Sequence, residues 1–115
     1  MAVQTKNWEI DANTTYQFVI EYKDPSGNPI DITGASAKMQ VRDATGQKLA
    51  FTLTSPAGGI TINGPTGTLT VKMTPTQTNK LFYPKSLYDL MLTDSNLNKI
   101  KLIGGYLILT KTVTI

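Results

Sequence analysis

The stretch that decides the fold is residues 37–42, AKMQVR, where apolar and polar side chains alternate one by one. Successive side chains of a β-strand point to opposite faces, so Ala37, Met39 and Val41 share one face. The opposite face carries only basic and amide side chains. This pattern is typical of a strand in an antiparallel sheet with one face on a core and the other toward solvent.

Similar alternation recurs along the chain, and clusters of Gly, Pro, Asn and Asp interrupt it about every ten residues. The turn at residues 63–67 is short, and the strands on either side of it are expected to pair. Seven to eight short strands predict an all-β fold, an antiparallel immunoglobulin-like β-sandwich. We find no internal repeat and no domain boundary, so residues 1–115 are expected to form one domain. The further strand segments are residues 16–22, 49–53, 60–62, 69–73, 87–92 and 100–109.

One short helix is expected between these strands. Thr74, Pro75 and Gln77 have the spacing of an N-cap, a first-turn proline and the reciprocal partner of a capping box. Pro84 ends the segment, because proline cannot continue a helix. The sequence therefore predicts a helical crossover at about residues 74–82 that lies over one end of a sheet.

The composition excludes several classes of site. The chain has 40% hydrophobic and 17% charged residues, as a folded domain does, but no cysteine and no histidine. Disulfides, thiolate metal sites and catalytic nucleophiles that a histidine activates as general base are therefore excluded. Asp24, Asn28 and Asp31 could offer oxygen ligands to calcium, but turn formation explains them fully. The turn aspartates also make a poor pair for glycoside hydrolysis, so we expect no enzyme activity, no metal and no cofactor.

The net charge is +3 and the isoelectric point is near 9.2. The eleven Lys and Arg residues are scattered without a run of three, so no basic stripe is apparent and no nucleic-acid partner is expected. The first residues form no apolar leader segment, and no run of 18 apolar residues occurs. We therefore expect synthesis in a cytosol without membrane insertion.

A set of short segments carries a resemblance to a known family. The segments are Trp8 and residues 22–34, 37–42, 67–69, 76–81, 88–90, 105–109 and 113–114. In this order and with these gaps, the chain resembles the small β-sandwich modules of tailed-phage virion proteins, including the amino-terminal domains of upper baseplate proteins and related tail-attachment modules.

The resemblance implies a non-enzymatic structural component of the virion, in the tail, baseplate or neck. Such a protein is made in the cytoplasm of the host bacterium and assembles through contacts with its own copies and with other virion proteins. Two alternatives stay open. One is a capsid decoration protein, and the other is a carbohydrate-binding or receptor-binding module that would use Trp8, Tyr83 or Tyr106 to stack on sugar rings.

Residues 102–109 are nearly uncharged and apolar on both faces, which is unusual for an exposed antiparallel strand. Either this is a central strand that the helical crossover covers on its second face, or its edge or face pairs with another subunit. On the second interpretation Tyr106 and Ile108 are interface residues. The tail at 110–115, with Val113 and Ile115, could add a strand to a neighbour.

Two aromatic residues have both a structural and a functional interpretation. Trp8, the single tryptophan, either plugs the open end of the sandwich or anchors a subunit contact. Tyr88 follows a short crossover at the start of a strand, as the tyrosine corner of immunoglobulin-like sandwiches does. Its hydroxyl is expected to bond backbone upstream in the chain.

Overall fold

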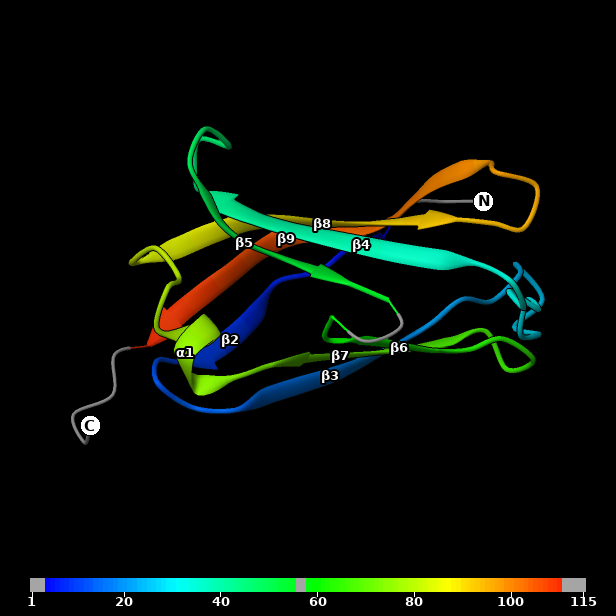
Figure 1. Cartoon of the computed structure of the whole chain (residues 1–115), viewed down its shortest axis with the longest axis horizontal. Coiled ribbons are helices and arrows are strands. Elements are labelled where there is room, and N and C mark those ends of the chain that lie inside the picture. Colours follow the sequence, from blue (N-terminus) through cyan, green and yellow to red (C-terminus); the bar gives the residue numbers. More distant parts are fainter. Residues whose placement is uncertain (1–3, 56–57, 111–115) are drawn as a thin grey trace.

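The computed structural model describes residues 4–55 and 58–110, which form two facing β-sheets and one short helix (Figure 1). Among these residues no helix is long and apolar enough to cross a membrane. The elements are β1 (Gln4–Thr5), β2 (Trp8–Asp11), β3 (Tyr16–Glu21), β4 (Ser36–Asp43), β5 (Leu49–Thr54), β6 (Ile60–Asn63), β7 (Thr68–Met73), α1 (Pro75–Thr78), β8 (Lys85–Thr93) and β9 (Lys99–Thr110).

The larger sheet has the strand order β1-β9-β8-β4-β5, with β2 also beside β9, and the smaller sheet has the order β3-β7-β6. Because β1 and β2 run one after the other along β9, they act as one interrupted strand and the segments amount to eight strands. The prediction of an all-β sandwich is confirmed, and so is the β6–β7 pairing across residues 63–67. The pairing of β1 and β2 with β9 is parallel, which the alternation along the sequence did not indicate.

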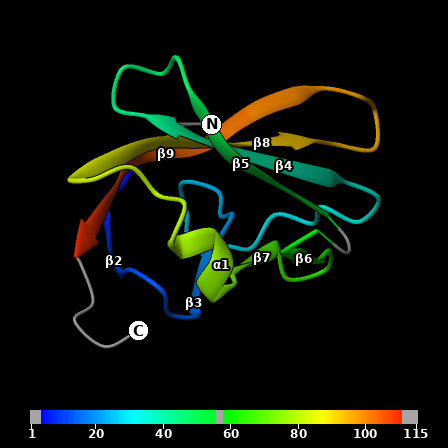
Figure 2. The same ribbon diagram turned by 60° about the vertical axis from the view of Figure 1, so that its left-hand side comes forward.

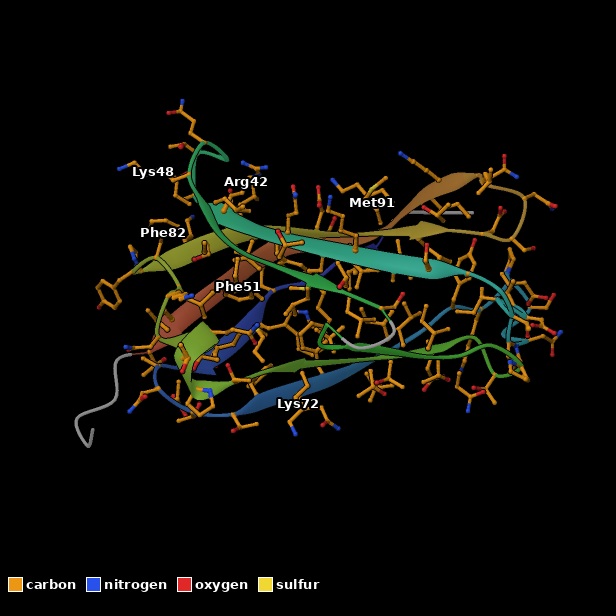
Figure 3. All side chains as sticks on the ribbon, in the orientation of Figure 1. Arg42, Lys48, Phe51, Lys72, Phe82 and Met91 are labelled. Carbon is orange, nitrogen blue, oxygen red and sulfur yellow. The ribbon has the colours of Figure 1, made fainter. Side chains whose placement is uncertain are left out.

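The core lies between the two sheets and is built from the inward residues of each strand. Ala37, Met39 and Val41 are buried, as the alternation in residues 37–42 predicts. Their counterparts on the smaller sheet are Leu69, Val71 and Met73 of β7. Burial of each large apolar side chain stabilises the fold by about 1.5–3 kcal/mol. Figure 3 shows one of these side chains, Phe51, pointing from β5 into the space between the sheets.

Helix α1 closes one end of the sandwich (Figure 2). The capping box is present, because the Thr74 hydroxyl accepts from the Gln77 amide and the Gln77 side chain accepts from the Thr74 amide. The helix ends at Thr78, so the expected span of 74–82 was too long. The Thr78 hydroxyl donates to the Thr14 carbonyl at 2.7 Å, which ties the helix to the β2–β3 turn. Proline keeps the residue before it out of the helical conformation. Residues 79–84, which end at Pro84, therefore lead to β8 as turns and bends.

The N-terminal strand reaches β9 at a glycine. A Cβ atom on Gly105 would collide with the Lys6 carbonyl oxygen, and φ at Gly105 is +151°. The adjacent Tyr106 amide donates to Oδ1 of Asn7 at 2.9 Å. Paired glycines within a strand can mark a bulge or a close backbone approach, and the structure shows the close approach at Gly105. The irregularity in β9 pairing lies earlier, at Leu102.

Candidate interaction surfaces

Strand β9 has hydrogen-bonded neighbours on both sides. Strand β8 lies along one side and β1 and β2 along the other, so the interpretation of β9 as a central strand is confirmed and its edge is not free to pair with another subunit. A contact through its face stays a prediction. The expected cover of its second face by the helical crossover was wrong. Helix α1 lies between the sheets at one end, and the side of β9 that faces away from the core stays uncovered (Figures 1 and 2).

Half-buried apolar side chains gather on this uncovered side. Tyr106 pairs with Leu87 across the β8–β9 ladder, and both point away from the core. Ile108 and Met91 lie on the same side, one on each strand. The sandwich core is on the other side, so these residues are half-buried only by their neighbours within the sheet.

Positive charges surround the apolar residues. Lys38 pairs with Met91 and Met91 with Lys101, while Lys85 pairs with Ile108, so cations and apolar side chains alternate across the strands. The Lys85 ammonium lies 4.3 Å from the centre of the Tyr106 ring, a cation–π contact. We call this surface the outer face. It comprises Lys38, Gln40, Arg42, Lys85, Leu87, Asp89, Met91, Lys99, Lys101, Tyr106 and Ile108.

The outer face holds five of the eleven Lys and Arg residues of the chain and one acidic residue, Asp89. A second acidic residue borders it, because Glu9 of β2 pairs with Ile108 and is exposed. Figure 3 shows Arg42 and Met91 on this side and Lys72 on the opposite side of the molecule. The exposed side of the smaller sheet is instead rich in threonine, with Thr68 and Thr70 on β7. The positive charge is therefore concentrated on the larger sheet.

The sequence did not predict the outer face, because its members are up to 70 positions apart, from Lys38 to Ile108. The alternation in residues 37–42 already places Lys38 and Arg42 on one face. The missing information was the register of β8 between β4 and β9, which brings Lys101 and Lys38 to the two sides of Met91.

Trp8 lies at the open side of the sandwich, between the edges of the two sheets. Its indole stacks on Phe18 of the opposite sheet at 4.3 Å between ring centres. Its Nε1 donates to the Tyr88 hydroxyl at 2.9 Å, and that hydroxyl donates to the Lys6 carbonyl at 2.7 Å. Trp8 thus joins the two sheets, at their side and not at an end. Its expected role as an anchor between subunits stays a prediction.

Tyr88 bonds backbone upstream in the chain, as expected, although the acceptor is 82 positions away. The ring is buried within β8, with 2% of its surface exposed. Burial raises the pKa of Tyr88 to about 12, and the hydrogen bond from Trp8 offsets part of this rise.

The three aromatic residues considered for sugar stacking lie in three different places. The two ring faces of Trp8 are covered, one by Phe18 and the other by the Lys6 ammonium at 4.5 Å. Tyr106 is on the outer face under Lys85, and Tyr83, 61% exposed, follows α1. These three rings do not form a common platform.

The tail residues Val113 and Ile115 lie outside the described residues. Thr110 is the last residue of β9, and its carbonyl accepts from the Ala12 amide at 2.8 Å. Thr110 is therefore part of the sheet and not of a tail that adds a strand to a neighbour.

The candidate calcium ligands serve the turns. Oδ1 of Asp24 accepts from the amides of Ser26 and Asn28, and Oδ1 of Asp31 accepts from the amide and hydroxyl of Thr33. The Thr33 hydroxyl is the main cause of a lowered pKa at Asp31. Over residues 4–55 and 58–110 no three His, Cys, Asp or Glu residues converge as metal ligands would.

Comparison with known proteins identifies the fold and no family. No family model and no curated protein matches the sequence. Among solved structures, 131 chains are similar, so this architecture occurs widely. One of them, CopC from Methylosinus trichosporium OB3b, superposes with a TM-score of 0.53 at 12% identity, over 95% of this chain and 88% of CopC. At that identity the similarity extends to the fold alone.

Proposed function

We propose that this protein is a non-enzymatic structural component of a tailed-phage virion, in the tail, baseplate or neck, and that it assembles through subunit contacts. The order of sequence segments shared with phage β-sandwich modules supports the virion setting. The outer face supports the assembly. Other virion proteins and further copies of this chain are the proposed partners.

The observation that carries the proposal is the mixture of apolar and cationic side chains on the outer face. The solvent side of an antiparallel sheet is ordinarily polar, yet Leu87, Met91, Tyr106 and Ile108 stand there together. Aromatic residues, methionine and arginine are enriched at the centres of protein interfaces, and lysine is more common at the rim. The outer face has this composition.

The charges limit how two copies can meet. A two-fold contact of outer face on outer face would place Lys38, Lys85 and Lys101 opposite like charges, which is unfavourable. The outer face therefore contacts a different, acidic surface, either on another virion protein or on a second copy. Repetition of such a heterologous contact gives a ring when the rotation closes.

A copper site does not fit these residues. Biological copper sites use imidazole, thiolate and thioether ligands. This chain has no histidine and no cysteine, and the sulfurs of Met39 and Met73 belong to fully buried core residues. Met91 on the outer face is a single thioether whose strand neighbours are Lys38 and Lys101. We therefore derive no metal-binding function from the shared fold.

The experiment compares two substitutions, each of which replaces a β-branched apolar side chain on the side of a sheet that faces away from the core. Ile108→Thr changes the outer face, and Val19→Thr changes the opposite sheet at a residue that is 49% exposed. Both keep a β-branched side chain, so strand propensity changes little. Light scattering after size-exclusion chromatography should show a smaller assembly for Ile108→Thr and the wild-type mass for Val19→Thr. Equal masses for the two variants would refute the outer face as the contact.

A further inference from the structure

Leu97, at the tip of the β8–β9 hairpin, has a backbone conformation that glycine has in two similar turns of this chain. In each of these turns an aspartate carboxylate accepts two amides, and the residue three positions after it has positive φ. Gly27 has φ +87°, Gly46 has φ +80° and Leu97 has φ +66°. The aspartates are Asp24, Asp43 and Asp94.

Two unfavourable features therefore coincide at Leu97. The left-handed conformation is strained for a residue with a Cβ atom. The side chain is also 81% exposed, the highest exposure of any large apolar residue in the described part of the chain. The Leu97 amide donates to the Asp94 carbonyl at 3.0 Å, which holds the turn, while the side chain stays exposed. Strained residues that persist in this way occur preferentially at functional sites.

A hollow of about 390 Å³ lies next to this tip. Its apolar lining includes Ile32, Ile62 and Pro65, and its polar lining consists of hydroxyl groups such as that of Thr61. None of its lining residues is charged. The hollow is larger than one leucine side chain, and its hydroxyl groups are chemically suited to amide side chains.

The tip and the hollow share one end of the sandwich. A Cβ atom on Gly34, which lines the hollow, would lie 3.3 Å from Cβ of Ser95 in the hairpin. The loop at residues 31–34, the β6–β7 turn and the hairpin are all at the end opposite α1 (Figure 1). A projecting group and a hollow side by side make a self-complementary surface, on which each copy can insert its group into the other.

We propose that Leu97 inserts into this hollow in a second copy of the chain, with Asn96 and Asn98 against its hydroxyl groups. Leu97 and the residues that line the hollow are uncharged, and the ionised group beside them in the hairpin is the Asp94 carboxylate, which accepts from Asn96 and Asn98. The inference rests on the proposed function, because it supplies a second subunit contact for the same assembly. It uses surfaces separate from the outer face.

The first test is Leu97→Gly, measured by light scattering over a wide range of protein concentrations. Glycine accepts positive φ, so the turn is kept and the monomer should unfold at an equal or higher denaturant concentration than wild type. Association should weaken roughly tenfold or more, because a buried leucine is lost from the contact. Leu49→Thr, at another exposed leucine, is the control and should associate as wild type does.

The second test uses the absence of cysteine from the chain. Asn96→Cys chains are mixed with Thr61→Cys chains under mild oxidation, and separately with Val19→Cys chains. If the tip of one copy lies in the hollow of another, the Asn96→Cys and Thr61→Cys pair should form roughly tenfold more mixed disulfide than the Val19→Cys pair. Mass spectrometry identifies the cross-linked peptides.

The outcomes separate this contact from the proposed function. Equal association of Leu97→Gly and wild type, or equal cross-linking of the two cysteine pairs, overturns the Leu97 contact. The proposed function then still stands if Ile108→Thr reduces the assembly. A wild-type chain that is monomeric at every concentration overturns the Leu97 contact and any contact of the outer face with a second copy.

Discussion

At the scale of single residues, the hydrogen-bonded chain from Trp8 through Tyr88 to Lys6 joins the N-terminal strand to the centre of the larger sheet. The sequence indicated a structural role for Tyr88 and a hydroxyl bond to upstream backbone. It could not identify the acceptor, because Lys6 becomes a neighbour of Tyr88 only when β1 pairs with β9. The stacking of Trp8 on Phe18 likewise depends on how the two sheets face each other.

Tyr88→Phe tests this connection. It leaves Nε1 of Trp8 and the Lys6 carbonyl without their shared partner, and unfolding by denaturant at neutral pH should show a loss of about 1–3 kcal/mol in the free energy of unfolding. The Trp8 emission spectrum of the folded variant should also change. An unchanged free energy would show that the two hydrogen bonds contribute nothing net.

The same residue predicts a dependence on alkaline pH. The folded-state pKa of Tyr88 is raised from 10 to about 12, so above pH 10 the unfolded chain loses this proton before the folded chain does. The free energy of unfolding should therefore fall between pH 10 and pH 12, by about 2 kcal/mol from this group. Tyr88→Phe lacks the group, and its pH profile should be flatter over this range by that amount. Parallel profiles would contradict the raised pKa.

At the scale of elements, local patterns predicted the strands better than their arrangement. Alternation in residues 37–42 and the capping box at Thr74 depend on near neighbours, and both are present in the structure. The parallel pairing of the N-terminal strand depends instead on distant contacts along β9. Residues 4–11 contain little alternation of their own, and Gly105 is the sequence feature that permits their approach.

Gly105→Ala should loosen the N-terminal strand. The added Cβ would collide with the Lys6 carbonyl at a backbone angle that alanine disfavours, and the free energy of unfolding should fall by about 2 kcal/mol or more. Gly104→Ala is the matched control, because its Cβ would meet chiefly the flexible end of the Lys101 side chain, at 3.1 Å. Denaturant unfolding followed by Trp8 fluorescence measures both. Equal losses would show that the close approach is not the cause.

The tail beyond β9 carries a separate prediction. Removal of residues 111–115, which include Val113 and Ile115, should weaken assembly if the tail adds a strand to a neighbour. The thermal midpoint of the dilute protein should stay unchanged, because β9 and its bond from Ala12 to Thr110 are intact. A truncated chain with the wild-type assembly mass would exclude this role of the tail.

At the scale of the whole molecule, the two sheets carry different outer surfaces. The larger sheet is cationic with apolar side chains at its centre, and the smaller sheet is rich in threonine. The end opposite α1 adds an uncharged tip and hollow at Leu97. A sequence of scattered lysines does not reveal such a division, since it arises only when the strand register is set. A rigid block with distinct contact surfaces is suited to repeated assembly.

The most direct measurement of the central claim is the mass of the full chain in solution, by size-exclusion chromatography with light scattering over the widest accessible concentration range. We predict a closed oligomer that Ile108→Thr reduces in mass and Val19→Thr leaves unchanged. A strict monomer at every concentration, for the wild type as for both variants, would contradict assembly through subunit contacts.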